Sequence, residues 1–255
     1  MKRKIKKMFL GIYNFFEKAV VLNCKKLWLI SQRSRLVNKY LMSYQVHKLQ
    51  LGGGANLLDG WLNTDFLPRH KEVIILDATK PFFFKKNCFD YIFCEHMIEH
   101  ISYQDTMCML KECFRILKPE GKIRISTPDL EVYLELFAAQ KSELQKQHLA
   151  WIGKNWLQRQ GIHSCNEAFV LNLMMHSWGH KFIYDFKTLE FALKESGFSH
   201  ITRASVKQSD ENHFKGIEKH GDYIQNIKGI KNQSGSEVDN KMNEFGTLTV
   251  EASRK

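Results

Sequence analysis

Two Glu-His pairs stand four residues apart in the stretch FCEHMIEHI, residues 93–101. The neighbouring residues are apolar, so these titratable side chains directly follow what reads as a buried strand. Three of them, His96, Glu99 and His100, have the spacing i, i+3 and i+4 and would share one face of a helical turn. They could therefore converge on a metal ion or on a substrate.

This cluster has three interpretations. In the favoured one its side chains line a ligand pocket, and in the second His100 or His96 is a general base. In the third it binds a metal, with a further ligand from HSWGH, where His176 and His180 are four residues apart. One carboxylate with two or more imidazoles favours Zn²⁺, Mn²⁺ or Fe²⁺ over Mg²⁺. Such an ion would bind an acceptor hydroxyl and lower its pKa.

A glycine turn follows the first expected strand in KLQLGGGAN, residues 48–56. Such a turn brings backbone N–H groups close to a ligand at the carboxyl edge of a parallel sheet. A dinucleotide fingerprint would require a third glycine three residues after Gly54, where this chain has Leu57. The pattern therefore argues against an NAD site, and a purely structural turn is the alternative.

Two aspartates close the next two expected strands. The carboxylate of Asp65 would accept hydrogen bonds from both hydroxyls of a ribose, and Asp77, followed by Ala78, would lie at the edge of a base. Two strand-terminal carboxylates beyond a Gly-x-Gly turn suit a nucleoside without a pyrophosphate. That is the outline of S-adenosylmethionine.

Short apolar runs alternate with helical patterns from residue 48 onward. Strands are expected within residues 48–56, 60–66, 72–79, 89–96 and 122–130, and helices over 103–117 and 185–198. Strands that alternate with helices predict parallel βαβ units and an α/β, doubly wound sheet.

The second half of the chain departs from this alternation. Residues 131–184 are mostly helical and too long for a simple crossover, so we expect a lid or a substrate-side insertion. Residues 200–206 and 247–253 alternate in the manner of antiparallel edge strands. The polar segment between them, residues 208–245, is expected to be a long mobile loop.

The net charge of +11 belongs to the N-terminal segment. Residues 1–49 hold twelve Lys and Arg against one acid, and the rest of the chain holds 26 of each sign. The six cysteines show no metal-type spacing, and no apolar run is long enough to span a membrane. We therefore expect a reduced, cytoplasmic compartment and reject a secretion signal, because no cleavage site follows the start.

The N-terminal segment, residues 1–47, contains a basic amphipathic helix. Apolar side chains recur at helical spacing between residues 5 and 30, with lysines around them. One interpretation is a helix that packs on the following domain. Another is a helix that lies on an anionic membrane surface through residues 2–30, peripheral to the inner face. Nucleic acid is the least supported partner, because a basic helix alone says little.

From Leu49 to about Leu134 the chain resembles class I S-adenosylmethionine (SAM)-dependent methyltransferases of the type 11 kind. Within them it is similar to a bacterial group associated with gene clusters for surface polysaccharides. The resemblance rests on four stretches: LQLGGGANLLDGWLNTDF, LDATKPFFFKKNCFDYIFCEHMIEHI, CFRILKPEGKIRISTPDL and GHKFIYDFKTLEFALKESGF. With TLTVEAS it implies one methyltransferase domain over residues 48–255, built on a mostly parallel, Rossmann-like sheet of seven strands.

The resemblance implies SAM as the cofactor and assigns its binding residues. The glycines of the turn, Gly52, Gly53 and Gly54, map to the methionine side and Asp65 to the ribose. Asp77 and Ala78 map to the adenine, and Glu95 and His96 lie beyond the fourth strand. Only ten residues separate Gly54 from Asp65, so the first crossover helix must be very short or absent.

The same resemblance bears on the Glu-His cluster. A Glu-His pair at this place is widespread in the superfamily as part of the SAM pocket, without a metal. The spacing also resembles the Glu-x-x-Glu-His cation site of ubiquinone-pathway and small-RNA 2′-O-methyltransferases, with His96 in place of the first Glu. The metal set would then be His96, Glu99 and His100, and the pocket-lining interpretation remains the favoured one.

For several further side chains the sequence leaves two alternatives, contact with the acceptor or a purely structural role. Asp129, after the fifth strand, would orient or deprotonate an acceptor or cap the next helix. His180 would face an acceptor or pack in the lid together with Tyr184 and Asp185. Three tryptophans would line an acceptor pocket or belong to an aromatic core: Trp151, Trp156 and Trp178.

These features together predict a cytoplasmic SAM-dependent methyltransferase that methylates an oxygen, or alternatively a nitrogen. The expected acceptor is a small molecule, a nucleotide sugar or a lipid-linked glycan. The expected catalytic residues are His100, His96, Asp129 and His180. The alternatives are an RNA methyltransferase, a SAM-binding module without catalysis and a membrane-attached interaction protein.

Overall fold

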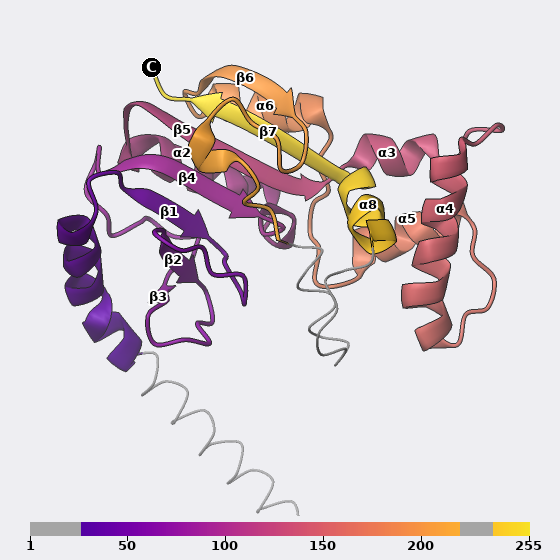
Figure 1. Ribbon diagram of the computed structural model, residues 1–255, viewed down its shortest axis with the longest axis horizontal. Coiled ribbons are helices and arrows are strands. Elements are labelled where there is room, and N and C mark those ends of the chain that lie inside the picture. The colour runs from indigo at the N-terminus through magenta and orange to yellow at the C-terminus, as the bar shows by residue number, and fades with distance from the viewer. Residues whose placement is uncertain (1–26, 220–236) are drawn as a thin grey trace, which may run out of the picture.

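The computed structural model describes residues 27–219 and 237–255 (Figure 1). These residues form one seven-stranded sheet in the order β3-β2-β1-β4-β5-β7-β6. The strands are β1 (Lys48–Leu51), β2 (Leu62–Asp65), β3 (Ile74–Ile75), β4 (Phe89–Glu95), β5 (Leu117–Pro128), β6 (Ser199–Ala204) and β7 (Thr247–Ser253). The first five pair in parallel, whereas β7 pairs antiparallel with both β5 and β6. The predicted α/β fold with a mostly parallel, seven-stranded sheet is confirmed.

Three strands differ from their predicted form. β5 begins at Leu117, directly after α2, and not near residue 122. β3 has only two residues and ends before Asp77, so that aspartate lies in the following turn. β7 is an interior strand and not an edge strand, because it forms hydrogen bonds to a neighbour on each side. Its alternating pattern arises because Leu248, Val250 and Ala252 enter the core while the residues between them face the other way.

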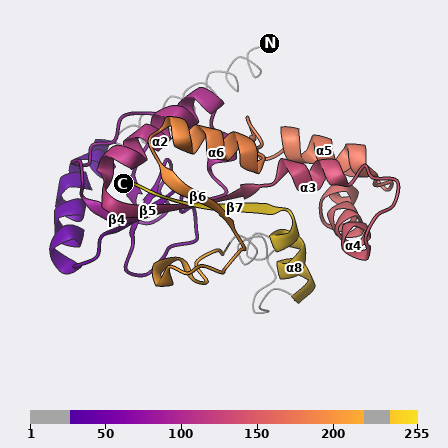
Figure 2. The same ribbon diagram turned by 90° about the horizontal axis from the view of Figure 1, so that it is seen from above.

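Two helices, α2 (Tyr103–Ile116) and α6 (Phe186–Glu195), cover one face of the sheet (Figure 2). Each begins at a capping side chain: Ser102 accepts a hydrogen bond from the N–H of Asp105, and Asp185 accepts one from the N–H of Thr188. Residues at helical spacing are buried against the strands: Met109, Leu110, Cys113, Leu189 and Leu193. Both helices lie where the sequence predicts them.

A helix over residues 27–43 packs on the same core through Val37 and Tyr40. The hydroxyl of Tyr40 donates to the carbonyl of Lys48 at 3.0 Å and accepts from its N–H at 2.8 Å, which ties the helix to the start of β1. Most of the basic segment lies outside the described residues, so its contact with a membrane surface stays a prediction. Among the described helices, none combines the length and the apolar character that crossing a bilayer requires.

The opposite face of the sheet is covered in a different way. β1 and β2 are joined by residues 52–61 without a helix, as the short spacing predicts. Leu58 and Trp61 of this connection pack with Phe93 of β4 and with Phe214, which follows β6 in the chain. The rings of Trp61 and Phe214 stack with centroids 6.4 Å apart. Residues 205–219, irregular apart from a 3₁₀ turn, η4 (Asn212–Phe214), therefore cover this side of the sheet (Figure 2).

A fully buried arginine, Arg124 on β5, holds this covering segment against the sheet. Its guanidinium donates to the carboxylate of Glu218, at 2.5 Å, and to that of Glu251 on β7. It also donates to the carbonyl oxygens of Ser205 and Gln208, both at 2.9 Å. A charge that is out of contact with water needs such a set of partners, so strand and covering segment depend on each other.

Replacing Arg124 by Ala is expected to lower the free energy of unfolding by about 3–5 kcal/mol, because Glu218 would stay buried without its cation. Urea denaturation followed by circular dichroism measures the change. The matched control is Lys194→Ala, which removes an exposed ion pair with Glu190 on α6 and should cost less than about 0.5 kcal/mol. Equally small losses in both variants would contradict the anchoring role of Arg124.

A set of helical segments lies beyond the carboxyl end of β5 (Figure 1). It consists of α3 (Leu130–Glu135), α4 (Glu143–Ile152), a π-helix (Gly153–Leu157), a 3₁₀ turn (Gln158–Gln160) and α5 (Glu167–His176). These segments enclose a second apolar cluster: Tyr133, Leu136, Ile152, Leu157, Val170, Leu173 and Met174. The predicted helical character of this insertion is confirmed, and its movement as a lid stays a prediction.

The prediction of one long loop over residues 208–245 is wrong at its end, where α8 (Glu237–Phe245) is helical. The stretch EVDNKMNEF has few apolar residues, so its helical pattern is weak in the sequence. The helix is held by tertiary contacts: Met242 is buried, and Asp239 accepts a hydrogen bond from Nε1 of Trp151 at 2.6 Å.

Candidate functional site

A cavity of about 460 Å³ opens where β1, β2 and β3 end. Its lining brings the glycine turn together with Asp65, at the end of β2, and Asp77, in the turn after β3. The lining residues include Gly52, Asp65, Phe66, Asp77, Ala78, Thr79, His96, Met97 and His100. Parallel strands place their carboxyl ends at one edge of the sheet, which is where α/β folds bind ligands.

Asp65 ends β2 and turns back toward the glycine turn. Its carboxylate accepts hydrogen bonds from the N–H of Gly54, at 2.9 Å, and of Leu67, at 2.7 Å. An ionised carboxylate has about four acceptor positions, so these two bonds leave capacity for the hydroxyls of a ligand. The short β1–β2 connection therefore does not keep Asp65 away from the site.

Asp77 lies in the turn after β3. Its Oδ1 accepts hydrogen bonds from the N–H of Thr79, at 3.0 Å, and from the hydroxyl of the same residue, at 2.7 Å. This is an aspartate turn of the kind that stabilises a chain reversal. Ala78, at its centre, lines the cavity with only a methyl group, which leaves room for a flat ring beside it.

The glycine turn depends on its glycines at two positions. Gly52 has φ +65° and Gly54 has φ +55°, a region that other residues adopt at a cost. A Cβ on Gly52 would lie 2.4 Å from Cγ of Met97, so the space is already filled. A Cβ on Gly54 would meet nothing within 4 Å, because that position faces the open site. Gly53 donates its N–H to the carbonyl of Thr64, which joins the turn to β2.

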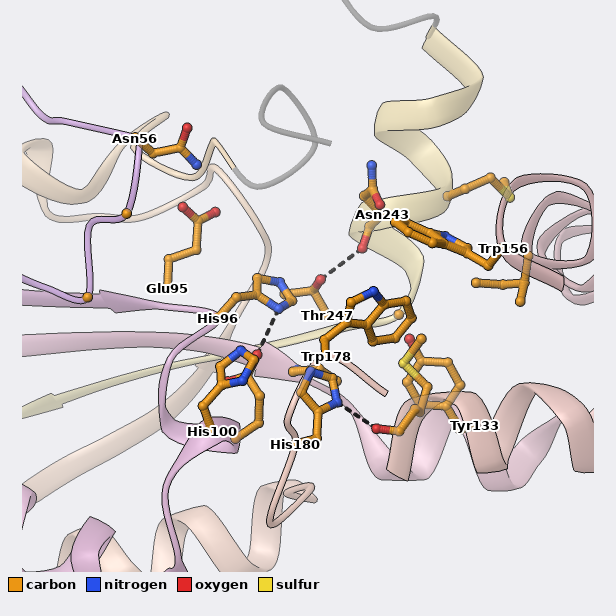
Figure 3. Close-up of a pocket in the computed structure, with 18 of the residues that line it drawn as sticks. Asn56, Glu95, His96, His100, Tyr133, Trp156, Trp178, His180, Asn243 and Thr247 are labelled. Carbon is orange, nitrogen blue, oxygen red and sulfur yellow. Dashed lines mark hydrogen bonds and ion pairs between the residues drawn. The ribbon is translucent and has the colours of Figure 1, made fainter. Parts of the chain in front are cut away.

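The Glu-His cluster begins at a strained residue. His96 follows β4 with φ +45° and leads into a single 3₁₀ turn, η1 (Ile98–His100). Nδ1 of His96 lies 3.1 Å from Oε1 of Glu99, which is fully buried, and the Thr127 hydroxyl donates to Oε2 at 3.1 Å. His96 and Glu99 thus form a pair with each other, as the close-up shows for His96 (Figure 3).

This pairing sets the charge of both groups. Burial disfavours the imidazolium, but the hydrogen bond and the negative charge of Glu99 outweigh burial and raise the pKa of His96. Burial likewise disfavours the carboxylate, but the hydrogen bond from His96 outweighs it and lowers the pKa of Glu99. The pair is therefore a buried ion pair.

His100 meets His180, eighty residues later in the chain. The two imidazole rings are T-shaped, with centroids 4.9 Å apart. Trp178 and Gly179 both have positive φ, +55° and +83°, and this turn carries His180 toward the cluster. Nδ1 of His180 lies 2.5 Å from the carbonyl of Met174, and burial lowers the pKa of the ring. His180 is therefore neutral near pH 7.

A second cavity, of about 440 Å³, adjoins the first, because Gly52, His96 and His100 line both. It extends from the glycine turn to the helical insertion (Figure 3). Aromatic side chains dominate its far end: Tyr133, Trp151, Trp156 and Trp178. Trp156 and Trp178 pack edge to face with centroids 5.0 Å apart. The three tryptophans named from the sequence thus line one chamber.

Several predicted residues have other roles. Asp129 caps α3 by accepting from the N–H of Glu131, and it lines neither cavity. Burial raises the pKa of Asp129, with Arg203 only partly opposing. Tyr184 is fully buried in the core, and its hydroxyl donates to Thr106 at 2.8 Å. Of the alternatives drawn from the sequence, helix capping therefore describes Asp129. The expected lid packing is wrong for Tyr184, which belongs to the main core of the sheet.

The remaining residues predicted from the sequence, His176, Asp185 and Glu95, lie at three different places relative to the cavities. His176 ends α5 in an exposed position and lines neither cavity. Asp185 caps α6, as its place before the helix suggests. Glu95 lines the second cavity, and its carboxylate accepts hydrogen bonds from the backbone N–H of Lys219, at 2.9 and 3.2 Å. The covering segment after β6 therefore reaches the rim of the site.

Two polar residues that the sequence reading missed lie in the aromatic chamber. His148 is 2% exposed, and neither of its ring nitrogens forms a hydrogen bond of good geometry with the described part of the chain. Nδ2 of Asn243, on α8, also lacks a partner there. One signal was present: His148 shares a helix face with Trp151 and Ile152, so an imidazole stands on an apolar face. Nothing comparable marks Asn243.

Burial lowers the pKa of His148 to about 4, and the nearby backbone of Met242 opposes the shift only in part. In the unfolded chain the pKa of a histidine is near 6.5. Below that pH, His148 therefore binds a proton in the unfolded chain, whereas the buried ring stays neutral in the folded chain. The free energy of unfolding should therefore be highest above pH 6.5 and should decrease by up to about 3 kcal/mol as the pH falls to 4.

Urea denaturation at pH 7 and pH 5 tests this expectation. His148→Phe should remove most of the decrease, because the ring already sits among aromatic side chains and gives up no hydrogen bond. His163→Phe, at an exposed position, is the control and should keep the decrease. An unchanged pH dependence in His148→Phe would contradict the assignment.

Comparison with known families gives one match. Residues 61–125 match a family model described as a methyltransferase domain. The stretch runs from Trp61, just before β2, into β5 and includes Asp65, Asp77, Glu95 and His96. No curated protein matches the chain.

Solved structures with a similar arrangement include a SAM-dependent methyltransferase from Archaeoglobus fulgidus, with 15% identity over 90% of this chain and 94% of that one and a TM-score of 0.44. A SAM-dependent methyltransferase from Mesorhizobium loti has 14% identity over 82% and 91%, also at 0.44. A Haemonchus contortus phosphoethanolamine N-methyltransferase, bound to phosphomonomethylethanolamine and S-adenosylhomocysteine, has 16% identity and a TM-score of 0.40. This chain covers 53% of it, and 88% of this chain is aligned.

At TM-scores below 0.5 these structural likenesses say nothing about activity. The family match is different, because it falls on the strands and turns that build the first cavity. It shows that residues 61–125, which carry Asp65, Asp77 and Glu95, are similar to a methyltransferase domain.

Proposed function

We propose that the chain is a SAM-dependent methyltransferase that methylates an oxygen of a small-molecule or glycan acceptor. The observation that carries this proposal is the junction of two cavities at Gly52, His96 and His100. One cavity ends at Asp65 and Asp77, and the other ends in an aromatic chamber. A cofactor and an acceptor that enter from these two ends would meet at the junction.

The first cavity fits the nucleoside part of SAM. The carboxylate of Asp65 suits the ribose hydroxyls, and the methyl group of Ala78 beside Asp77 leaves space for the adenine. The methionine part would extend past Gly52 to Gly54, where the lack of a side chain permits a close approach. The reactive methyl group would then lie at the junction.

The chamber fits a ring that is apolar on its faces and polar at its edge. Trp156 and Trp178 offer aromatic surfaces, and His148 and Asn243 offer polar atoms without partners in the described chain. Buried polar atoms of this kind generally have a partner, and the hydroxyls of a sugar would supply one. His148 is neutral near pH 7 and can both donate and accept.

The transfer itself needs little from the protein beyond positioning. Bound SAM would supply an electrophilic methyl group on its sulfonium sulfur, and transfer of that group to the acceptor oxygen would leave S-adenosylhomocysteine as a neutral thioether. Most of the acceleration would come from holding the oxygen, carbon and sulfur in line. The hydroxyl proton must leave as well, and the imidazoles of His100 and His180 stand at the junction where it is released.

Replacing Asp65 by Asn is expected to weaken binding of S-adenosylhomocysteine about 10- to 100-fold, because hydrogen bonds to a charged group contribute about 1.5–3 kcal/mol. Isothermal titration calorimetry of the full chain measures the affinity. Asp59→Asn changes an exposed carboxylate in the same connection and should leave the affinity unchanged. Absence of binding to folded wild-type protein would refute the methyltransferase proposal.

The acceptor class is tested by transfer of a labelled methyl group from SAM to a panel of nucleotide sugars and simple glycosides. Trp178→Ala should raise KM for any accepted sugar about fivefold, because an aromatic contact contributes about 1 kcal/mol, and should leave S-adenosylhomocysteine binding intact. Phe191→Ala, an exposed aromatic on α6, is the control. Transfer to no sugar, with cofactor binding intact, would reject the acceptor class alone.

A further inference from the structure

Three ligand atoms lie close together in the second cavity, beside its junction with the first at His100. Glu99, His100 and His180 each offer one oxygen or nitrogen, and these atoms lie within 4.8 Å of one another. Bonds of about 2.1 Å to a shared ion place its ligands about 3–4 Å apart, so a shift of less than about 1 Å per side chain would complete a site. Figure 3 shows His100 and His180 facing this point from different segments of the chain.

His180 is oriented as a metal ligand would be. Nδ1 donates its proton to the carbonyl of Met174 at 2.5 Å, so Nε2 is the nitrogen that carries the lone pair. Metal-bound imidazoles commonly donate their second N–H to a carbonyl in this manner, which fixes the tautomer and the ring. The two left-handed residues before His180 direct it to the cluster and not toward solvent.

Glu99 is held in the same manner. Its two oxygens already face Nδ1 of His96 and the hydroxyl of Thr127, and each oxygen keeps a second lone pair. A fully buried carboxylate that is fixed by two donors is a preorganised ligand. His96 then positions Glu99 and is not itself a ligand, so the set differs from His96, Glu99 and His100.

We propose that Glu99, His100 and His180 bind one divalent transition-metal ion, Zn²⁺, Mn²⁺ or Fe²⁺. One carboxylate with two imidazoles favours these ions over Mg²⁺ and Ca²⁺, which prefer oxygen ligands. All three residues line the second cavity, so an ion here keeps coordination positions open toward the acceptor. Only this acceptor role rests on the proposed function: a bound hydroxyl would lose its proton more readily.

Ion binding is tested on the full chain after dialysis against a chelator. Titration with Mn²⁺ is followed by electron paramagnetic resonance, and titration with Co²⁺ by its visible absorption, which reports the ligand geometry. Wild type should bind one ion per chain. His180→Ala and His100→Ala should each weaken binding more than about 100-fold, because loss of an outer-shell partner alone costs about 10- to 100-fold. His176→Ala, four residues before His180 and exposed, should bind as wild type does.

Glu99→Gln is a further variant, and circular dichroism checks that it folds. His180→Ala leaves the His96–Glu99 pair intact, so the test stands even if Glu99→Gln is unfolded. Failure of wild type to bind Mn²⁺ or Co²⁺, or binding by His180→Ala equal to wild type, would overturn the inference. Calorimetry with S-adenosylhomocysteine on the same dialysed protein separates the two proposals: cofactor binding without metal binding rejects only the metal site, and the reverse rejects only the methyltransferase.

Discussion

The connection between β1 and β2 is too short to contain a helix, and much of the structure depends on that constraint. A sheet needs cover on both faces to keep its apolar side chains from water. With α2 and α6 on one face, the other face is covered by irregular chain after β6, through Phe214 and the partners of Arg124. Backbone without regular hydrogen bonds needs polar partners, and a buried guanidinium supplies several at once.

This covering segment joins the fold to the site. The segment begins at the carbonyl groups that accept hydrogen bonds from Arg124. Within the described residues it ends at Lys219, whose N–H donates a hydrogen bond to the carboxylate of Glu95. The rim of the second cavity is therefore built partly by the chain that replaces a helix. α8 contributes to the same cavity through Met242 and Asn243, so both faces of the chamber come from parts of the chain far from the glycine turn.

Local patterns were enough to predict most strands of the sheet, the two helices that cover it and the glycine turn, because each depends on neighbours in the sequence. Apolar and polar residues alternate in KIRIST, a feature that the prediction did not use, although a doubly covered parallel strand would be apolar throughout. The partners of Arg124 could not be predicted, since Glu218 and Glu251 are about a hundred residues away. In the site, the sequence spacing identified Glu99 and His100. The approach of His180 to these two residues, and the lack of hydrogen-bond partners for His148 among the described residues, depend on the tertiary structure.

Phe214 and Trp61 stack where a crossover helix between β1 and β2 would otherwise lie. A crossover helix and the covering segment after β6 therefore exclude each other on this face of the sheet. Among homologous chains, a longer β1–β2 connection should thus accompany a shortened or deleted segment after β6, and the arginine of β5 should disappear with it. The lengths of the β1–β2 connection and of the segment after β6 would covary, although no pair of residues between the two segments does. An engineer who inserts a helix into the first connection would have to delete the distant segment in the same step.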